Sequence, residues 1–102
     1  MKTWFITGAS RGFGARIARL ALARGDNVVA TARSVDSLTK ALGDHDALLP
    51  LPVDVTNEAQ IHAAVDAALA RFGRIDILLN NAGFGLLGAV EEATADEVER
   101  LY

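Results

Sequence analysis

The stretch best suited to ligand chemistry is T-G-A-S-R-G-F-G at residues 7–14. Its glycines follow the spacing G-x-x-x-G-x-G; the commoner G-x-G-x-x-G would need a glycine where Ile17 stands. A glycine at a strand end permits a turn with positive φ, and the next two let backbone and helix approach a pyrophosphate closely. A helix starting here would offer N–H groups and partial positive charge to phosphate. The candidate ligands are Gly8, Ser10, Arg11, Gly12, Phe13 and Gly14.

Other polar residues follow apolar runs later in the chain. Arg33 follows the run at 27–32, Asp54 the run at 47–53, and Asn81 the run at 75–79. A guanidinium group pairs with phosphate in bidentate geometry, and an amide supplies two donors and an acceptor. Each feature also has a simpler interpretation: a glycine-rich turn, a solvated surface charge, or a residue that only helps the chain to turn.

The apolar runs predict the strands that would position these residues. Runs at 2–7, 27–32, 47–53 and 75–79 are typical of parallel strands buried on both faces. Pro50 and Pro52 cannot donate ladder hydrogen bonds, so we expect the third strand at the edge of the sheet.

Helical periodicity occupies the intervals between the runs. We expect a first helix that ends at Gly25 and a second over 34–42 with Ser34 as its N-cap and Gly43 after it. The first helix is expected to bury Phe13, Ile17, Leu20 and Ala21.

A third helix is expected to start at Asn57, with Gln60 completing a capping box and Gly73 closing it. Its apolar stripe comprises Ile61, Val65, Leu69 and Phe72. Thr94 and Glu97 form a second capping box, which predicts the start of a fourth helix.

Four strands alternating with three full helices imply right-handed βαβ units. The expected fold is α/β: the N-terminal half of a Rossmann-type, doubly wound parallel sheet with strand order 3-2-1-4. Because the fourth helix has hardly begun at Tyr102, we interpret residues 1–102 as the nucleotide-binding portion of one longer domain. The apolar run at 75–79 would then be an open sheet edge prone to self-association.

The fold gives the glycine stretch a more specific meaning, since the first strand–helix junction of such a sheet binds dinucleotides. A carboxylate that would bind the ribose hydroxyls of NAD is expected at position 32, which is Ala32. Arg11 and Arg33 suit a 2′-phosphate instead. NADP is therefore favoured over NAD, although Asp36 lies close in sequence.

Three motifs together resemble the short-chain dehydrogenase/reductase family: residues 7–14, Asp54-Val55, and Asn80-Asn81-Ala82-Gly83. The resemblance spans nearly the whole chain and implies an NAD- or NADP-dependent enzyme. It implies that the Asp54 side chain and the Val55 backbone border the adenine. It also implies that Asn81, Ala82 and Gly83 lie along the cofactor.

The catalytic residues of that family are missing from these 102 residues. The family uses Tyr-x-x-x-Lys for proton transfer, and the single tyrosine here is Tyr102. We therefore expect the cofactor-binding half of an NADP-dependent oxidoreductase that interconverts small-molecule alcohols and carbonyls by hydride transfer, with no activity of its own. A longer parent protein is expected to be a homo-oligomer. The alternatives are a non-catalytic dinucleotide-binding module and an inactive fragment.

The amino-acid composition argues against several other classes of protein. The net charge of −3 argues against binding nucleic acid or anionic membranes through bulk charge. Apolar residues make up 51%, which excludes disorder, yet no apolar run approaches the ~20 residues of a membrane span. There are no cysteines, and His45 and His62 lie in unrelated segments, so neither a thiolate zinc site nor a histidine triad is expected. We expect a cytoplasmic protein without a metal site.

Overall fold

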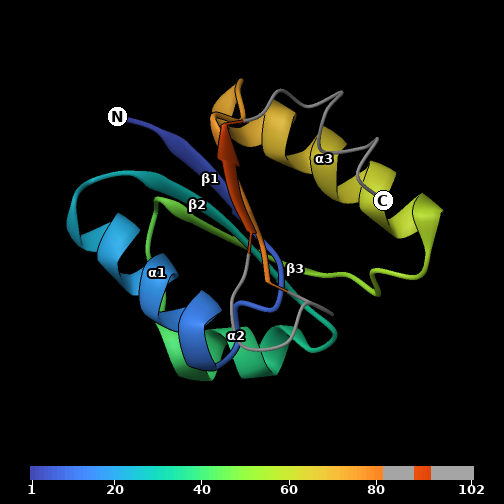
Figure 1. The fold of residues 1–102 in the computed structure, drawn as a ribbon, viewed down its shortest axis with the longest axis horizontal. Coiled ribbons are helices and arrows are strands. Elements are labelled where there is room, and N and C mark those ends of the chain that lie inside the picture. Colours follow the sequence, from blue (N-terminus) through green and yellow to red (C-terminus); the bar gives the residue numbers. More distant parts are fainter. Residues whose placement is uncertain (82–88, 93–102) are drawn as a thin grey trace.

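The computed structural model describes residues 1–81 and 89–92, which form a five-stranded sheet and three helices (Figure 1). The strands are β1 (Thr3–Ile6), β2 (Asn27–Ala32), β3 (Leu48–Pro52), β4 (Ile77–Asn80) and β5 (Ala89–Glu92). The helices are α1 (Gly12–Ala23), α2 (Val35–Leu42) and α3 (Glu58–Phe72). The sheet order is β3-β2-β1-β4-β5, and the first four strands are parallel. The predicted α/β fold and the order 3-2-1-4 are confirmed.

The sheet is covered on both faces, α1 and α2 lying on one side and α3 on the other (Figure 1). Successive strand residues point to opposite faces. Phe5 therefore packs in the core with α3, whereas its neighbour Ile6 packs in the core with α1 and α2. This double covering explains why the strands read as continuous apolar runs.

The helices bury smaller residues than the sequence pattern suggested. In α1 the buried positions are Gly14, Ala15, Ala18 and Ala21, whereas Phe13 and Leu20 are 38% and 54% exposed. In α3, Ile61 and Val65 are buried as predicted, but Leu69 is exposed and alanines complete the buried face. The predicted α1 stripe is confirmed at Ala21 and, partly buried, at Ile17, but it is wrong at Phe13 and Leu20. Alanine lets the helix pack closely against the sheet, where a larger side chain would not fit.

The predicted caps of α2 and α3 are present. Ser34 Oγ accepts a hydrogen bond from Ser37 N, and Asn57 Oδ1 accepts one from Gln60 N. The full capping box is not formed, because Gln60 Oε1 accepts from Asp54 N at 2.8 Å, whereas Asn57 N donates to the Asp54 carbonyl. The Gln60 side chain thus ties the end of β3 to the start of α3.

Two strands, β3 and β4, were predicted to lie at the edges of the sheet, and only β3 does so. β3, with its prolines, is the edge strand predicted from the sequence. β4 is not an edge, because β5 pairs with it antiparallel, from Ile77↔Glu92 to Asn80↔Ala89. The expected open edge at 75–79 is therefore wrong: the chain returns along β4 and satisfies its outward N–H and C=O groups. The helix predicted from Thr94 lies outside the described residues.

Two carboxylates hold the amino end of β1. Asp26 accepts hydrogen bonds from Lys2 N (3.0 Å) and from the Trp4 indole Nε1 (3.1 Å), and Asp76 accepts one from Thr3 N (2.8 Å). Asp26 is buried, and the hydrogen bond from Lys2 N, followed by that from Trp4, lowers the pKa of its carboxyl group. Burial raises the pKa of Asp76, but the hydrogen bonds from Thr3 N and Arg74 outweigh it and leave that pKa lowered. Both carboxylates therefore stabilise the fold in their ionised form.

Candidate cofactor-binding cleft

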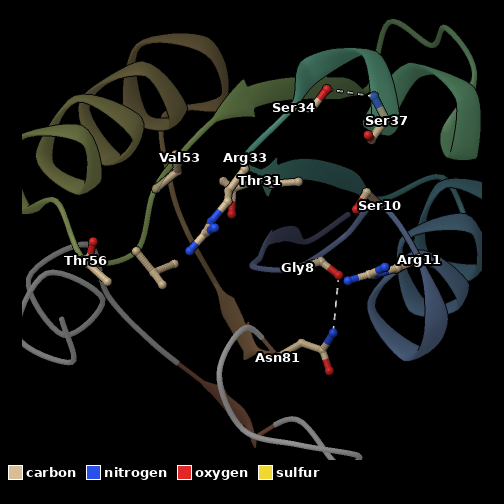
Figure 2. A pocket seen from close by; sticks show the side chains of 12 residues that line it. Gly8, Ser10, Arg11, Thr31, Arg33, Ser34, Ser37, Val53, Thr56 and Asn81 are labelled. Carbon is tan, nitrogen blue, oxygen red and sulfur yellow. Dashed lines mark hydrogen bonds between the residues drawn. The ribbon is translucent and has the colours of Figure 1, made fainter.

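An open cleft of about 860 Å³ lies at the carboxyl ends of the parallel strands, where ligands bind in sheets of this type (Figure 2). It is lined by Gly8, Ser10, Arg11, Thr31, Ala32, Arg33, Ser34, Ser37, Val53, Val55, Thr56 and Asn81. The glycine loop, the end of β2, the start of α2, the segment after β3 and the residue after β4 all contribute. Residues from most of the chain thus converge on one site.

Six of the predicted site residues line this cleft: Gly8, Ser10, Arg11, Arg33, Val55 and Asn81. Gly12, Phe13, Gly14 and Asp54 do not line it, and Ala82 and Gly83 lie outside the described residues. Sequence reasoning did not predict the other six lining residues, Thr31, Ala32, Ser34, Ser37, Val53 and Thr56, as site residues. The rule that ligands gather at strand carboxyl ends could have found Thr31, which lies near the end of β2, and Val53 and Thr56, which follow β3.

The glycine loop has the backbone geometry that the spacing predicted. Gly8 and Gly12 both have φ of 62°, a conformation that favours glycine, and Ala9 N donates to the Thr31 carbonyl at 3.0 Å. Arg11 is the N-cap residue of α1, but its side chain makes no capping hydrogen bond, and no acidic residue occupies the first turn. The N-terminus of α1 therefore offers backbone N–H groups and a positive dipole end that suit an anionic ligand.

Gly14 makes a close contact within the protein. A Cβ atom at this buried position would lie 2.5 Å from the Gly8 carbonyl oxygen and 3.0 Å from Asn81 Nδ2. No side chain fits at such distances without a shift of backbone. The third glycine thus allows α1 to pack directly against the turn that follows β1.

Residues at the end of β4 hold this turn in place. Asn81 Nδ2 donates to the Gly8 carbonyl at 3.2 Å, and Asn81 N donates to Thr7 Oγ1 at 2.9 Å. Thr7 Oγ1 in turn donates to Asn80 Oδ1 at 3.2 Å in the buried interior. The asparagine pair therefore links β4 to β1 and to the glycine loop through side chains as well as through the sheet.

Asp54 is part of the turn into α3 and borders a second, smaller cavity. Its Oδ1 accepts from Thr56 Oγ1 (2.7 Å) and Thr56 N (2.9 Å), and these hydrogen bonds lower the pKa of the carboxyl group, with the charge of Arg33 adding to the effect. The second cavity, of about 540 Å³, is lined by Arg33, Pro52, Asp54 and Gln60. Arg33 is the residue shared by these two cavities.

Two other kinds of site are not found in the described part of the chain. Residues 1–81 and 89–92 contain no group of three or more histidine, cysteine or acidic side chains placed to hold a metal ion. None of the three described helices combines the length and the apolar character that crossing a bilayer requires. The site consists of backbone N–H groups, hydroxyls, an amide and two guanidinium groups.

A glycine loop at the first strand–helix junction, opening onto the carboxyl ends of a parallel sheet, defines a dinucleotide-binding protein. The family model for short chain dehydrogenases matches residues 2–102, and the chain belongs to this family. An oxidoreductase of Botryotinia fuckeliana, BOA17, is 44% identical over 98 residues, which cover 94% of this chain and 36% of that protein. The chain thus spans about a third of the length of this curated relative.

Two solved structures show the same arrangement with a cofactor. The 3-ketoacyl-(acyl-carrier-protein) reductase of Brucella melitensis, complexed with NADH, is 42% identical with a TM-score of 0.76; the match covers 82% of this chain and 35% of that one. The C-domain of a bacterial malonyl-CoA reductase with NADP is 37% identical with a TM-score of 0.73, covering 80% of this chain and 14% of that one. These two neighbours bind different nicotinamide dinucleotides, so the choice between them depends on the residues of this chain.

Proposed function

We propose that this chain is the cofactor-binding part of an NADP-dependent oxidoreductase that transfers hydride between a small alcohol and its carbonyl. The charge of the main cleft is the observation that favours NADP over NAD. Its described lining contains Arg11 and Arg33 but no acidic residue, and Ala32 stands where a ribose-binding carboxylate is expected. A 2′-phosphate would gain two guanidinium partners there.

Each part of the cleft has a role in this proposal. The N-terminus of α1 and the turn at Gly8 would receive the pyrophosphate, and Arg11 and Arg33 would receive the 2′-phosphate. Val55 would border the adenine, and Asn81 would hold the glycine loop while facing the cofactor. Bound NADPH would supply the hydride, and this chain would bind and orient the cofactor.

These 102 residues contain no pair of side chains that would transfer a proton to or from the substrate. The sequence has no Tyr-x-x-x-Lys pair, and Tyr102 is its single tyrosine. An unperturbed tyrosine has a pKa near ~10, so a neighbouring cation is needed for proton transfer at neutral pH. We infer that the 102-residue chain binds NADPH without oxidising it when carbonyl compounds are added. We also propose a cytoplasmic location, which the composition predicts, and a homo-oligomeric parent protein, which the family resemblance implies.

The test is titration of the chain with NADPH, comparing wild type with Gly12→Val. Gly12 has φ of +62° and begins α1, so valine strains the loop that would receive the pyrophosphate. Gly73→Val is the matched control, because Gly73 also has positive φ (+80°) and open space around it, but ends α3 away from the cleft. We expect saturable binding that Gly12→Val abolishes and Gly73→Val retains. Absence of wild-type binding, or equal loss in the two variants, would contradict the proposal.

A further inference from the structure

Arg33 stands between the two cavities at the carboxyl end of the sheet. It lines the main cleft together with Arg11, and it lines the second cavity together with Asp54 and Gln60. Its side chain extends from the end of β2 toward the segment after β3 that carries Val53 and Thr56 (Figure 2). The guanidinium group is therefore within the electrostatic influence of that segment as well as of the cleft.

Asp54 is the acidic residue of the second cavity, and its carboxylate is held in place. Two hydrogen bonds from Thr56 fix Oδ1, and the backbone N–H of Asp54 is fixed by Gln60 Oε1. A carboxylate held in this way is a stationary negative charge. Arg33, which lines the same cavity, is exposed and has a long flexible side chain, and its charge acts on Asp54.

We propose that Asp54 competes with the 2′-phosphate of the cofactor for Arg33 and thereby sets how strongly the cleft distinguishes NADP from NAD. This inference rests on the proposed function. A 2′-phosphate can bind Arg33 only to the extent that the guanidinium is not already attracted to the Asp54 carboxylate. NAD has no such phosphate, so the competition weakens NADP binding selectively, and specificity is a difference between the two affinities.

The experiment compares two fragments of the cofactor, adenosine 2′,5′-bisphosphate and 5′-AMP, which differ by the 2′-phosphate. Dissociation constants are measured at low salt for wild type, Asp54→Asn and Arg33→Ala, and for the double variant. Asp54→Asn keeps an oxygen acceptor for Thr56 while removing the charge. Asp66→Asn is the control, because it changes net charge equally from an exposed position in α3 but lines neither cavity.

We expect Asp54→Asn to raise the ratio of the 5′-AMP constant to the bisphosphate constant by about three- to tenfold, the effect of one partly screened charge. The rise should be absent in Asp66→Asn and much smaller in the Arg33→Ala background. An unchanged or lower ratio in Asp54→Asn, or an equal rise without Arg33, would overturn the inference.

Failure of the proposed function has a different signature. If wild type binds neither fragment, or binds both equally, the proposal for NADP fails and the inference falls with it. If wild type prefers the bisphosphate and Asp54→Asn leaves that preference as it was, the proposal for NADP stands and the inference alone is wrong.

Discussion

The side-chain nitrogen of Asn81 lies 3.2 Å from the carbonyl oxygen of Gly8 and donates a hydrogen bond to it, joining the end of β4 to the glycine loop. The two residues are 73 positions apart in sequence. Because Gly14 packs against the same carbonyl, the three residues form one contact among β4, the turn after β1 and the start of α1. The shape of the cleft therefore depends on the hydrogen bond from the Asn81 side chain and on the close packing of Gly14 against the loop.

Removing the Asn81 amide should loosen the loop. Asn81→Ala should cost about 1 kcal/mol of unfolding free energy, the net value of a typical hydrogen bond, and weaken NADPH binding severalfold. Chemical unfolding and a binding titration measure the two effects. Asn27→Ala is the control, because Asn27 Nδ2 donates to Thr3 Oγ1 at the opposite end of the sheet. If both variants bind NADPH like wild type, Asn81 does not position the loop.

Adding a single methyl group at Gly14 should be more damaging than at an unobstructed glycine. Gly14→Ala places Cβ 2.5 Å from the Gly8 oxygen, and overpacking of this kind costs about 1–3 kcal/mol. The shift it forces on the loop should also reduce NADPH binding at least tenfold. Titrating the variant with NADPH and following its unfolding in urea check both effects.

Gly25→Ala gives the comparison, since Gly25 has φ of +87° but nothing within 4 Å of a Cβ atom. It should cost about 1–2 kcal/mol through backbone strain and leave binding intact. Wild-type binding by Gly14→Ala would show that the close contact with Gly8 has no bearing on the site.

The carboxylates at the amino end of β1 should make stability fall in acid. The pKa values of Asp26 and Asp76 are lowered in the folded state, so their contribution is fully present above the unfolded value near ~4 and is lost as the pH falls through the folded values. Unfolding free energy should thus decline below about pH 4. Asp26→Asn should be less stable at neutral pH and show a shallower acid slope.

Urea unfolding from neutral pH into acid, followed by the fluorescence of Trp4, measures this directly. Trp4 is the single tryptophan of the sequence, and its indole donates to Asp26. An acid slope that is identical in Asp26→Asn and wild type would show that Asp26 does not contribute to it.

Local patterns in the sequence predicted most of the fold. Alternating strand and helix signals gave the order 3-2-1-4, and Ser34, Asn57 and Gly73 marked helix ends correctly because caps depend on neighbouring residues. The buried face of α1 was mispredicted at Phe13 and Leu20, since the need for small residues arises only when the helix packs against the sheet. The antiparallel return of β5 depends on pairing with β4, which no local signal specifies.

Part of the lining of the cleft was predicted from the sequence. The glycine loop and Arg33 follow from the position of ligands at strand carboxyl ends, so both could be found from the sequence. The contact of Gly14 with Gly8 and the hydrogen bond from Asn81 could not, because each joins atoms that only the folded chain brings together. The placement of Asp54 in a second cavity likewise depends on how the segment after β3 turns into α3.

The central claim is that two arginines and the absence of an acidic residue in the described lining make the cleft selective for NADP. The most direct test is calorimetric titration of the chain with NADP⁺ and with NAD⁺ at the same salt concentration. We predict that NADP⁺ binds at least about tenfold more tightly, as expected for charge-assisted hydrogen bonds to the 2′-phosphate, and that Arg33→Ala removes most of the difference. Equal binding of the two cofactors, or tighter binding of NAD⁺, would contradict the account.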